Sequence, residues 1–333
     1  MRAFVTGGGG FIGLALARQL RERGDEVRAL VRTTARAGAL EEIGCELVEG
    51  DLASTEKLAK RMTGCDAVFH VAGVYRVGIP VSQRPGMYAA NVTGTANVLE
   101  AATAVGIPRT VAVSTINAFG NTAGRVVDET YRRPEPPDYV SYYDETKHLA
   151  QHLEAEARAA AAARVVIVQP GQVYGPGDHS AIGGLMRQAA AGSLRALTFP
   201  HLGLNMVHVD DVAAGICLAH DRGRLGQSYV LGGEITTLGE LVRKAAAAAG
   251  KPPPRITMPS WLLRAAAAGA GLLGPLLGGR TNLPELISAS DGVTYWASDA
   301  KARRELGYAP RDLDTGLREL FGAALARGNR LAD

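Results

Sequence analysis

Short apolar runs alternate with longer helical patterns over the first half of the chain. The runs are apolar throughout, a pattern typical of strands buried on both faces, and the helical stretches between them indicate parallel pairing. The six predicted strands are Ala3–Thr6, Val27–Val31, Glu46–Val48, Ala67–Val71, Thr110–Ser114 and Arg164–Gln169. We therefore predict an α/β fold with a doubly wound (Rossmann) parallel sheet, whose helices include Gly13–Arg23 and Tyr88–Val105.

After about residue 170 glycine and proline become denser and buried-strand runs become rarer. Ala-rich helices are predicted at Leu238–Ala249 and Trp261–Leu273, which indicates a second, smaller and discontinuous C-terminal lobe. A further strand-then-helix pattern at Asn205–Ala219 suggests a return to the main sheet. We expect a sheet domain over residues 1–168 with a return segment near 205–226, and a second lobe made of residues 169–204 and 227–333.

Charge and cysteine content narrow the class of protein. The 333 residues carry 36 basic and 33 acidic side chains, a net charge of +3, and no block of five like charges, so nucleic acid is not expected as a partner. The three cysteines (Cys45, Cys65, Cys217) form no CxxC pair, and the scattered histidines suggest no metal site. The N-terminus lacks a signal peptide pattern, so a cytoplasmic location is expected.

One segment, residues 261–277, is apolar except for Arg264 and has the minimum length of a membrane span. Arg264 and the nearby glycine and proline residues argue against a transmembrane helix. We favour a helix over an apolar pocket, with peripheral membrane contact as the alternative.

A glycine cluster follows the first predicted strand directly. Gly7, Gly10 and Gly13 are spaced for a tight turn, for close approach of a diphosphate to the backbone, and for contact between helix and strand. The N-terminus of the next helix would then face the phosphates with free N–H groups. This position between strand and helix favours a dinucleotide site over a merely flexible loop.

The end of the second strand bears on which dinucleotide binds. Arg32 stands 19 residues beyond Gly13, where a bare ribose would favour Asp or Glu and a 2′-phosphate favours a guanidinium. Arg36 could add a second cation. We therefore expect NADP(H), with NAD(H) as the alternative. Asp51 follows the third strand and would accept from the adenine amino group or cap a helix.

Tyr143 and Lys147 stand four residues apart in a segment predicted to be helical through Ala157, so they share one face. A nearby ammonium can lower the pKa of a phenol and make it a useful acid-base group. Ser114 and Thr115 lie at the carboxyl end of the fifth strand, where ligands bind in open α/β sheets. Either hydroxyl could hold a substrate oxygen for Tyr143, and both could instead cap a turn.

These motifs, in this order, resemble those of the extended short-chain dehydrogenase/reductases. The resemblance also rests on the strand Asp66–Gly73, Asn91–Thr95, Gly171–Gly177, Val207–Val212 and the Leu306–Pro310 tail, and it spans nearly the whole chain. Within that superfamily the chain looks most similar to the dihydroflavonol-4-reductase-like and hopanoid-associated sugar-epimerase-like branch. The resemblance implies that the sheet domain binds a dinucleotide, that the second lobe binds substrate, and that a homodimer is possible.

The resemblance also implies residue roles. Tyr143 would be the general acid-base, Lys147 would bind the nicotinamide ribose and tune Tyr143, and the strand-end hydroxyl would orient the substrate oxygen. Spacing from Gly120 favours Thr115 over Ser114, and Asn91 would either hold a relay water or brace the loop. The remaining cofactor candidates are Phe11, Ile12, Leu52, Val71, Ala72, Gly73, Pro170 and Val173. The substrate candidates are Val74, Tyr75, Thr115, Asn117, Gln172, Tyr174 and Asn205.

Three functions follow as hypotheses. The first is an NADP(H)-dependent oxidoreductase that reduces a ketone or aldehyde of a small, partly apolar substrate, consistent with Arg32 and with apolar stretches at Val74–Ile79 and Phe199–Met206. The second is a nucleotide-sugar epimerase or dehydratase with retained cofactor. Against it, Ile116-Asn117 stands where the family's dehydratases carry Asp-Glu. The segment Leu202–Met206, directly before Val207, also lacks the Arg with which sugar-nucleotide members tend to grip the diphosphate. The third, a non-catalytic NADP-binding regulator, is disfavoured by the intact Tyr143 and Lys147.

Overall fold

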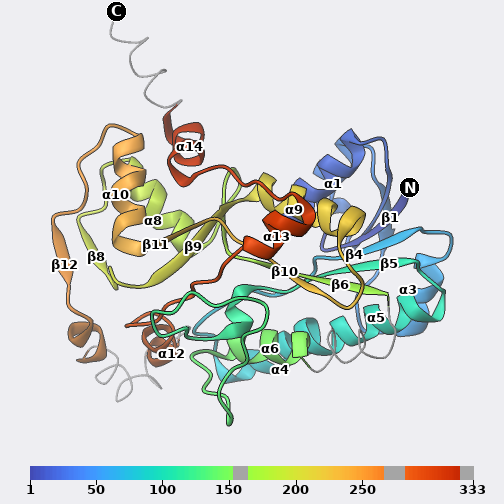
Figure 1. Ribbon diagram of the computed structural model, residues 1–333, viewed down its shortest axis with the longest axis horizontal. Helices are drawn as coiled ribbons and strands as arrows, with labels where there is room; N and C mark the ends of the chain where they lie inside the picture. Colours follow the sequence, from blue (N-terminus) through green and yellow to red (C-terminus); the bar gives the residue numbers. More distant parts are fainter. Residues whose placement is uncertain (153–163, 266–281, 323–333) are drawn as a thin grey trace, which may run out of the picture.

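Seven parallel strands form the main sheet of the protein, which we describe from a computed structural model covering residues 1–152, 164–265 and 282–322 (Figure 1). The strand order is β10-β6-β5-β4-β1-β2-β3, and every neighbouring pair is parallel. This confirms the predicted α/β class. The strands are β1 (Arg2–Thr6), β2 (Glu26–Val31), β3 (Glu46–Glu49), β4 (Ala67–His70), β5 (Arg109–Val113), β6 (Val165–Pro170) and β10 (Ser228–Leu231).

Both faces of the sheet are covered, which explains the continuous apolar runs. In β1, Ala3 and Val5 join one core cluster and Phe4 joins another, because successive strand side chains point to opposite faces. Helices α1 (Phe11–Glu22) and α9 (Val209–Arg222) pack against each other and contribute to the first cluster. Helices α3 (Thr55–Met62) and α5 (Gly94–Ala104) contribute to the second, on the opposite side in Figure 1.

The helix expected over Tyr88–Val105 is in fact built from three pieces. α4 (Arg84–Tyr88) runs through a π-helical turn, η3 (Ala89–Thr93), into α5. Such π turns are common at functional sites, and this one contains Asn91. The next helix, α6 (Tyr142–Leu149), begins as expected, and residues 153–163 lie outside the described part of the chain. The short segments nearby are η1 (Thr34–Arg36), α2 (Gly38–Glu42), η2 (Val81–Gln83) and η4 (Ile116–Phe119).

The second lobe contains two small sheets. One has the order β11-β9-β7 and the other pairs β12 with β8. Their strands are β7 (Gln172–Tyr174), β8 (Ala196–Thr198), β9 (Gly203–His208), β11 (Glu234–Thr237) and β12 (Ile256–Met258). The helices of this half are α8 (Ala181–Ala190), α10 (Leu238–Ala248), α12 (Leu283–Ser288), α13 (Ala300–Leu306) and α14 (Leu313–Leu317).

The chain returns to the main sheet later than its pattern suggested. Strand β9 lies in the second lobe, its helix α9 packs on α1, and β10 adds to the main sheet beside β6. All six residues of β9 are buried, as in a strand of the main sheet, so its local pattern does not reveal which sheet it joins.

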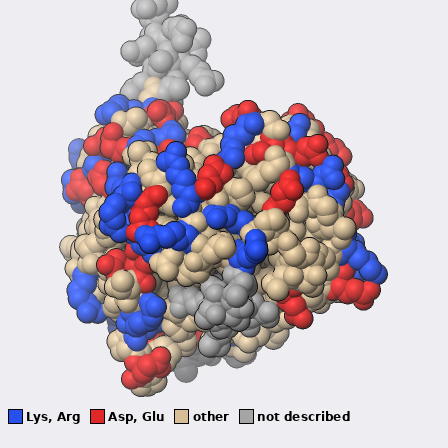
Figure 2. Space-filling model, turned by 45° about the vertical axis from the view of Figure 1, so that its right-hand side comes forward, with Lys and Arg blue, Asp and Glu red and all other residues tan. Residues whose placement is uncertain are grey.

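The surface of the protein carries charges of both signs. Acidic and basic side chains are interspersed over the face shown in Figure 2. Among the described residues no helix is long and apolar enough to cross a membrane. The apolar segment 261–277 is described only to residue 265, where Trp261 and Leu262 are exposed. The three cysteines are free and buried.

Candidate active site

The glycine loop between β1 and α1 forms a tight cradle. Gly7 has a φ of +72°, and a Cβ there would lie 2.6 Å from the main-chain nitrogen of Ala72. A Cβ on Gly13 would lie 2.1 Å from the carbonyl oxygen of Gly7. Gly10 caps α1 without a side-chain hydrogen bond, and the first turn, which includes Phe11 and Ile12, holds no acidic residue. The N–H groups of this turn are therefore available to a diphosphate, and the cradle fits a dinucleotide.

The loop after β2 presents two cations. Arg32 and Arg36 are exposed, on either side of Thr34, whose N–H and hydroxyl both donate to Glu49 at distances of 3.0 and 3.2 Å. Glu49 ends β3, so the loop is fixed to the neighbouring strand. Asp51 accepts from the N–H of Ala53 at 3.0 Å and does not cap α3, whose cap is Ser54. Leu52 packs beside Gly94, where a Cβ would lie 2.9 Å from it.

The loop after β4 is held by a chain of hydrogen bonds with a fixed direction. Thr95 donates to the carbonyl of Asn91 at 2.6 Å and so accepts from His70 Nε2, 3.0 Å away. His70 Nδ1 then accepts from Thr6, 2.8 Å away, whose oxygen receives the N–H of Ala72 at 3.3 Å. Burial lowers the pKa of His70 to about 3, so the ring is neutral. This chain fixes Val71 and Ala72 beside the glycine cradle.

Asn91 braces the next part of the same loop. Its amide oxygen accepts from the N–H of Val74 at 2.7 Å, and its amide nitrogen donates to the oxygens of Val74 and Thr146, each at 3.0 Å. Both ends of the amide are thus engaged by protein groups. A Cβ on Gly73 would lie 3.5 Å from the Asn91 oxygen and 3.9 Å from Lys147 Nζ, so bare backbone faces Lys147 here.

Helix α6 brings Tyr143 and Lys147 to this edge of the sheet. Ser141 caps the helix by accepting from the N–H of Asp144 at 3.1 Å. Tyr143 is 7% exposed, contacts Ile79 and Met87, and meets Tyr75 edge-on with ring centroids 4.7 Å apart. Lys147 is 8% exposed, and burial lowers the pKa of its ammonium to about 8.

The pKa of Tyr143 moves opposite to the expected direction. Burial and, secondarily, Tyr75 raise the pKa of the phenol, while a hydrogen bond with Thr115 lowers it. Removal from water disfavours the phenolate more than its neighbours stabilise it. The phenol is protonated at neutral pH, as any tyrosine is, and burial makes it a weaker acid than a tyrosine in water.

The two strand-end hydroxyls are used differently. Ser114 donates to the side-chain oxygen of Gln151 at 2.6 Å, and Gln151 also accepts from Gln169. Thr115 begins the η4 turn, where its hydroxyl donates to the amide oxygen of Asn117 at 3.1 Å and accepts from the N–H of Asn117 at 3.2 Å. Of the two hydroxyls, it is the one that acts to lower the pKa of Tyr143, against the larger effect of burial.

The predicted second-lobe residues divide into two groups. Burial raises the pKa of the Tyr75 phenol and the side chain of Gln172 acts to lower it, so Gln172 lies near the ring that meets Tyr143. Asn205 is fully buried, donates to Ala297 at 2.6 Å and accepts from Gly233 at 2.7 Å, so its geometry is that of a structural brace. Tyr174 is 1% exposed in the core of the second lobe. Pro170 is buried at the end of β6, and Val173 packs against the main core.

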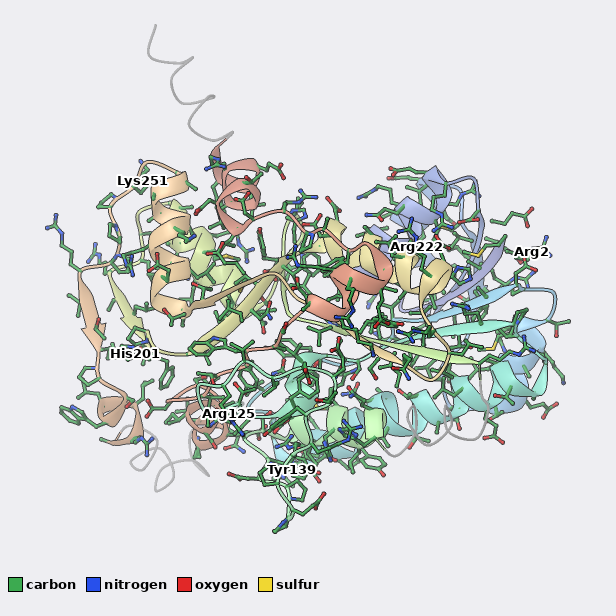
Figure 3. The ribbon with its side chains drawn as sticks, viewed as in Figure 1. Arg2, Arg125, Tyr139, His201, Arg222 and Lys251 are labelled. Atoms are coloured by element: carbon green, nitrogen blue, oxygen red, sulfur yellow. The ribbon has the colours of Figure 1, made fainter. Side chains whose placement is uncertain are left out.

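Two charged groups that the sequence did not single out support α6. Arg133 forms a two-pronged ion pair with Asp144, the residue after Tyr143, at 2.6 and 3.1 Å, with side chains 4% and 0% exposed. Arg133 belongs to the connection between β5 and α6, on which Figure 3 labels Arg125 and Tyr139. Glu285 of α12 accepts from the N–H of Tyr142 at 2.9 Å. Arg133 lies 11 residues before Asp144 in an irregular connection and Glu285 lies 143 residues after Tyr142, so no helical or strand periodicity signals either pair.

Within the described ranges no three His, Cys, Asp or Glu residues are grouped to hold a metal ion. The described residues bring two hydroxyls, a buried ammonium and a glycine cradle to one edge of the sheet.

Comparison with known proteins agrees with this geometry. Residues 3–232 match the model of the NAD-dependent epimerase/dehydratase family. A putative dihydroflavonol 4-reductase of Synechocystis is 36% identical, covering 91% of this chain and 89% of its own. A 2-alkyl-3-oxoalkanoate reductase of Stenotrophomonas maltophilia is 32% identical over 98% of this chain and 100% of its own. The crystal structure of gox2253 superposes with a TM-score of 0.81 at 34% identity, covering 98% of both chains.

Proposed function

The chain belongs to the NAD-dependent epimerase/dehydratase family and is an NAD(P)-dependent oxidoreductase, and we propose that it reduces the carbonyl group of a partly apolar ketone or aldehyde with NADPH. The observation that carries this proposal is that Lys147 donates to the carbonyl oxygen of Val113, two residues before Thr115, and so holds the helix that bears the buried Tyr143 against the strand end that bears Thr115. With the diphosphate of the dinucleotide held in the glycine cradle, the nicotinamide would supply the hydride for the carbonyl carbon.

The residues of the site bind the substrate and the ribose, transfer the proton and hold the neighbouring loop in place. Thr115 and Tyr143 hold the carbonyl oxygen, and Tyr143, protonated at neutral pH, gives it the proton as the alcohol forms. Lys147, cationic below pH about 8, holds the ribose hydroxyls and balances the developing charge on the Tyr143 oxygen. Asn91 keeps the loop of Val74 and Tyr75 in place.

The preference for NADPH is supported by the loop after β2. Arg32 and Arg36 are exposed there, and Glu49 is engaged by Thr34. Two guanidinium groups on a fixed loop suit a 2′-phosphate.

Three features favour a net reductase over a sugar-nucleotide epimerase or dehydratase. Ile116, where dehydratases of the family carry an acid, is 2% exposed. Strand β9 contains neither Lys nor Arg and all of its residues are buried, so this strand offers no guanidinium or ammonium to a diphosphate. The side chains against Tyr143, those of Ile79, Met87 and Tyr75, are apolar or aromatic. A partly apolar substrate suits such surroundings. The reductase names of two relatives are consistent with the same interpretation.

The nucleotide that copurifies with the protein, followed by titration of the stripped protein with NADPH and NADH, tests the proposal. Exchangeable NADPH bound more tightly than NADH supports it. Firmly retained NAD would contradict it and favour an epimerase or dehydratase.

A further inference from the structure

The first turn of α6 depends on a residue from the other end of the chain. Tyr142 is the first residue of the helix, and its N–H is one of the donors that a helix leaves without an internal acceptor. The hydroxyl oxygen of the cap Ser141 accepts from the N–H of Asp144, and its carbonyl oxygen accepts from the N–H of Glu145. The N–H of Tyr142 instead donates to Glu285 Oε1 of α12, 2.9 Å away and 143 residues along the chain.

Glu285 is held rigidly for this contact. Its side chain is 7% exposed. Its other oxygen accepts from Arg84 at 3.3 Å and from Asn282 at 3.1 Å, and the Asn282 oxygen accepts from the N–H of Glu285 in return. Arg84 also stacks on the ring of Tyr142, 4.8 Å from its centroid. The carboxylate thus has little freedom, and a displacement of Glu285 would move Tyr142.

The same junction holds the wall that faces Tyr143. The N–H of Asn282 donates to the carbonyl of Gly78 at 2.7 Å. Gly78 lies in the loop that carries Tyr75 and Ile79, and both side chains contact Tyr143. The start of α12 therefore binds the helix bearing Tyr143 and the loop packed against it.

We propose that Glu285 is a positioning residue for Tyr143, acting through the main-chain N–H of Tyr142 to align the phenol with Thr115. The proposal rests on the function proposed above, since it assigns Glu285 an effect on proton delivery. A misplacement of about 1 Å at a reacting group can cost about 100-fold in rate, so a small slip of this turn has a large effect.

Two conservative variants separate a positioning role from a charge role. Glu285→Gln keeps an acceptor oxygen at the same reach for Tyr142 and places an amide nitrogen where the other oxygen accepts from Asn282 and Arg84. Arg84, 34% exposed, can turn to solvent, and the Asn282 amide loses this one acceptor. Glu285→Asp keeps the charge but withdraws the acceptor by one methylene. The proposal expects Glu285→Gln to keep kcat within about 3-fold and Glu285→Asp to lose about 10-fold or more, with NADPH affinity unchanged in both.

Hydrogen exchange of the Tyr142 amide gives a readout that needs no substrate. The amide is expected to exchange at the wild-type rate in Glu285→Gln and faster in Glu285→Asp. Glu240→Asp, at a partly exposed residue of α10 paired with Arg243, is the control and should change neither readout. The reverse order, with Glu285→Asp near wild type and Glu285→Gln impaired, would overturn the proposal. If the wild type reduces no carbonyl compound, the proposed function fails, while the exchange order still decides whether Glu285 holds α6.

Discussion

Lys147 donates from its ammonium to the main-chain oxygen of Val113, 3.3 Å away, and so fastens α6 to the end of β5. Val113 is two residues before Thr115, so this bond sets the helix against the strand that carries the second hydroxyl of the site. The ammonium is buried at this contact, and the loss of its hydration destabilises the charged form in the folded state.

That cost predicts a more stable but inactive Lys147→Met variant. The folded pKa of Lys147 is about 8, below its ordinary value of 10.5. Below pH about 8 both folded and unfolded chains carry the charge, and only the folded one suffers desolvation. The free energy of unfolding should therefore rise by ~1–3 kcal/mol at pH 7, and the gain should shrink as pH rises from about 8 to 10.5. Urea unfolding at pH 7 and pH 10 measures this, with Lys251→Met, an exposed site, as control. A destabilised variant at pH 7 would contradict the burial argument.

Tyr143→Phe should lower kcat by about two to four powers of ten, because the proton donor is lost while the ring and its packing remain. Binding of NADPH should be unchanged. Tyr142→Phe is the matched control, since its ring lies one residue away and packs on Arg84. Normal turnover in Tyr143→Phe would remove Tyr143 from the mechanism.

Thr115 and Ser114 can be distinguished by replacing each hydroxyl. Thr115→Val should reduce kcat/KM by about 10- to 1,000-fold, since it removes a donor to the developing oxyanion. Ser114→Ala removes only the bond to Gln151 and should cost activity much less. Steady-state kinetics with one ketone compares them, and an equal or larger loss in Ser114→Ala would reverse the assignment.

Arg32→Ala should weaken NADPH binding by ~1.5–3 kcal/mol, the scale of a charge-assisted hydrogen bond, and leave NADH almost unaffected. Fluorescence titration with both nucleotides measures the two losses. Arg255→Ala, an exposed arginine before β12, controls for net charge. Equal losses for the two nucleotides would show that Arg32 does not contact the 2′-phosphate.

The pair of Arg133 and Asp144 should matter far more for stability than a surface pair. Arg133→Met leaves a buried carboxylate uncompensated and should cost ~3–5 kcal/mol of unfolding free energy. Lys60→Met breaks the pair with Glu56, in which the two side chains are 74% and 78% exposed, and should leave the unfolding free energy nearly unchanged. Denaturant unfolding measures both losses, and similar values for the two variants would contradict the burial of the Arg133 pair.

The features that could be predicted from the sequence are those set by residues close together in the chain. Strands such as β1 and β4 are apolar on both faces, and glycines such as Gly24 and Gly106 end the helices, so the order of elements could be predicted. The cradle of Gly7 and Gly13, and the i, i+4 pair of Tyr143 and Lys147, are likewise short-range patterns.

Long-range contacts explain what could not be predicted. Asn205 and Tyr174 are polar residues near the predicted pocket, yet backbone partners and core packing bury them. Glu285 meets Tyr142 only because the second lobe folds back onto α6. The direction of the Tyr143 pKa shift also depends on burial, which a spacing of four residues does not report.

The most direct test of net carbonyl reduction is the fate of the hydride. The stripped protein is mixed with NADPH carrying deuterium at both positions of nicotinamide C4 and with an alkyl or aryl ketone, and the products are analysed by mass spectrometry. The account predicts one NADP⁺ released per alcohol formed, with one deuterium on the carbinol carbon, and no such product from Tyr143→Phe at the same enzyme concentration and time. Failure to oxidise NADPH with any ketone, together with turnover of a nucleotide sugar on retained NAD, would contradict it.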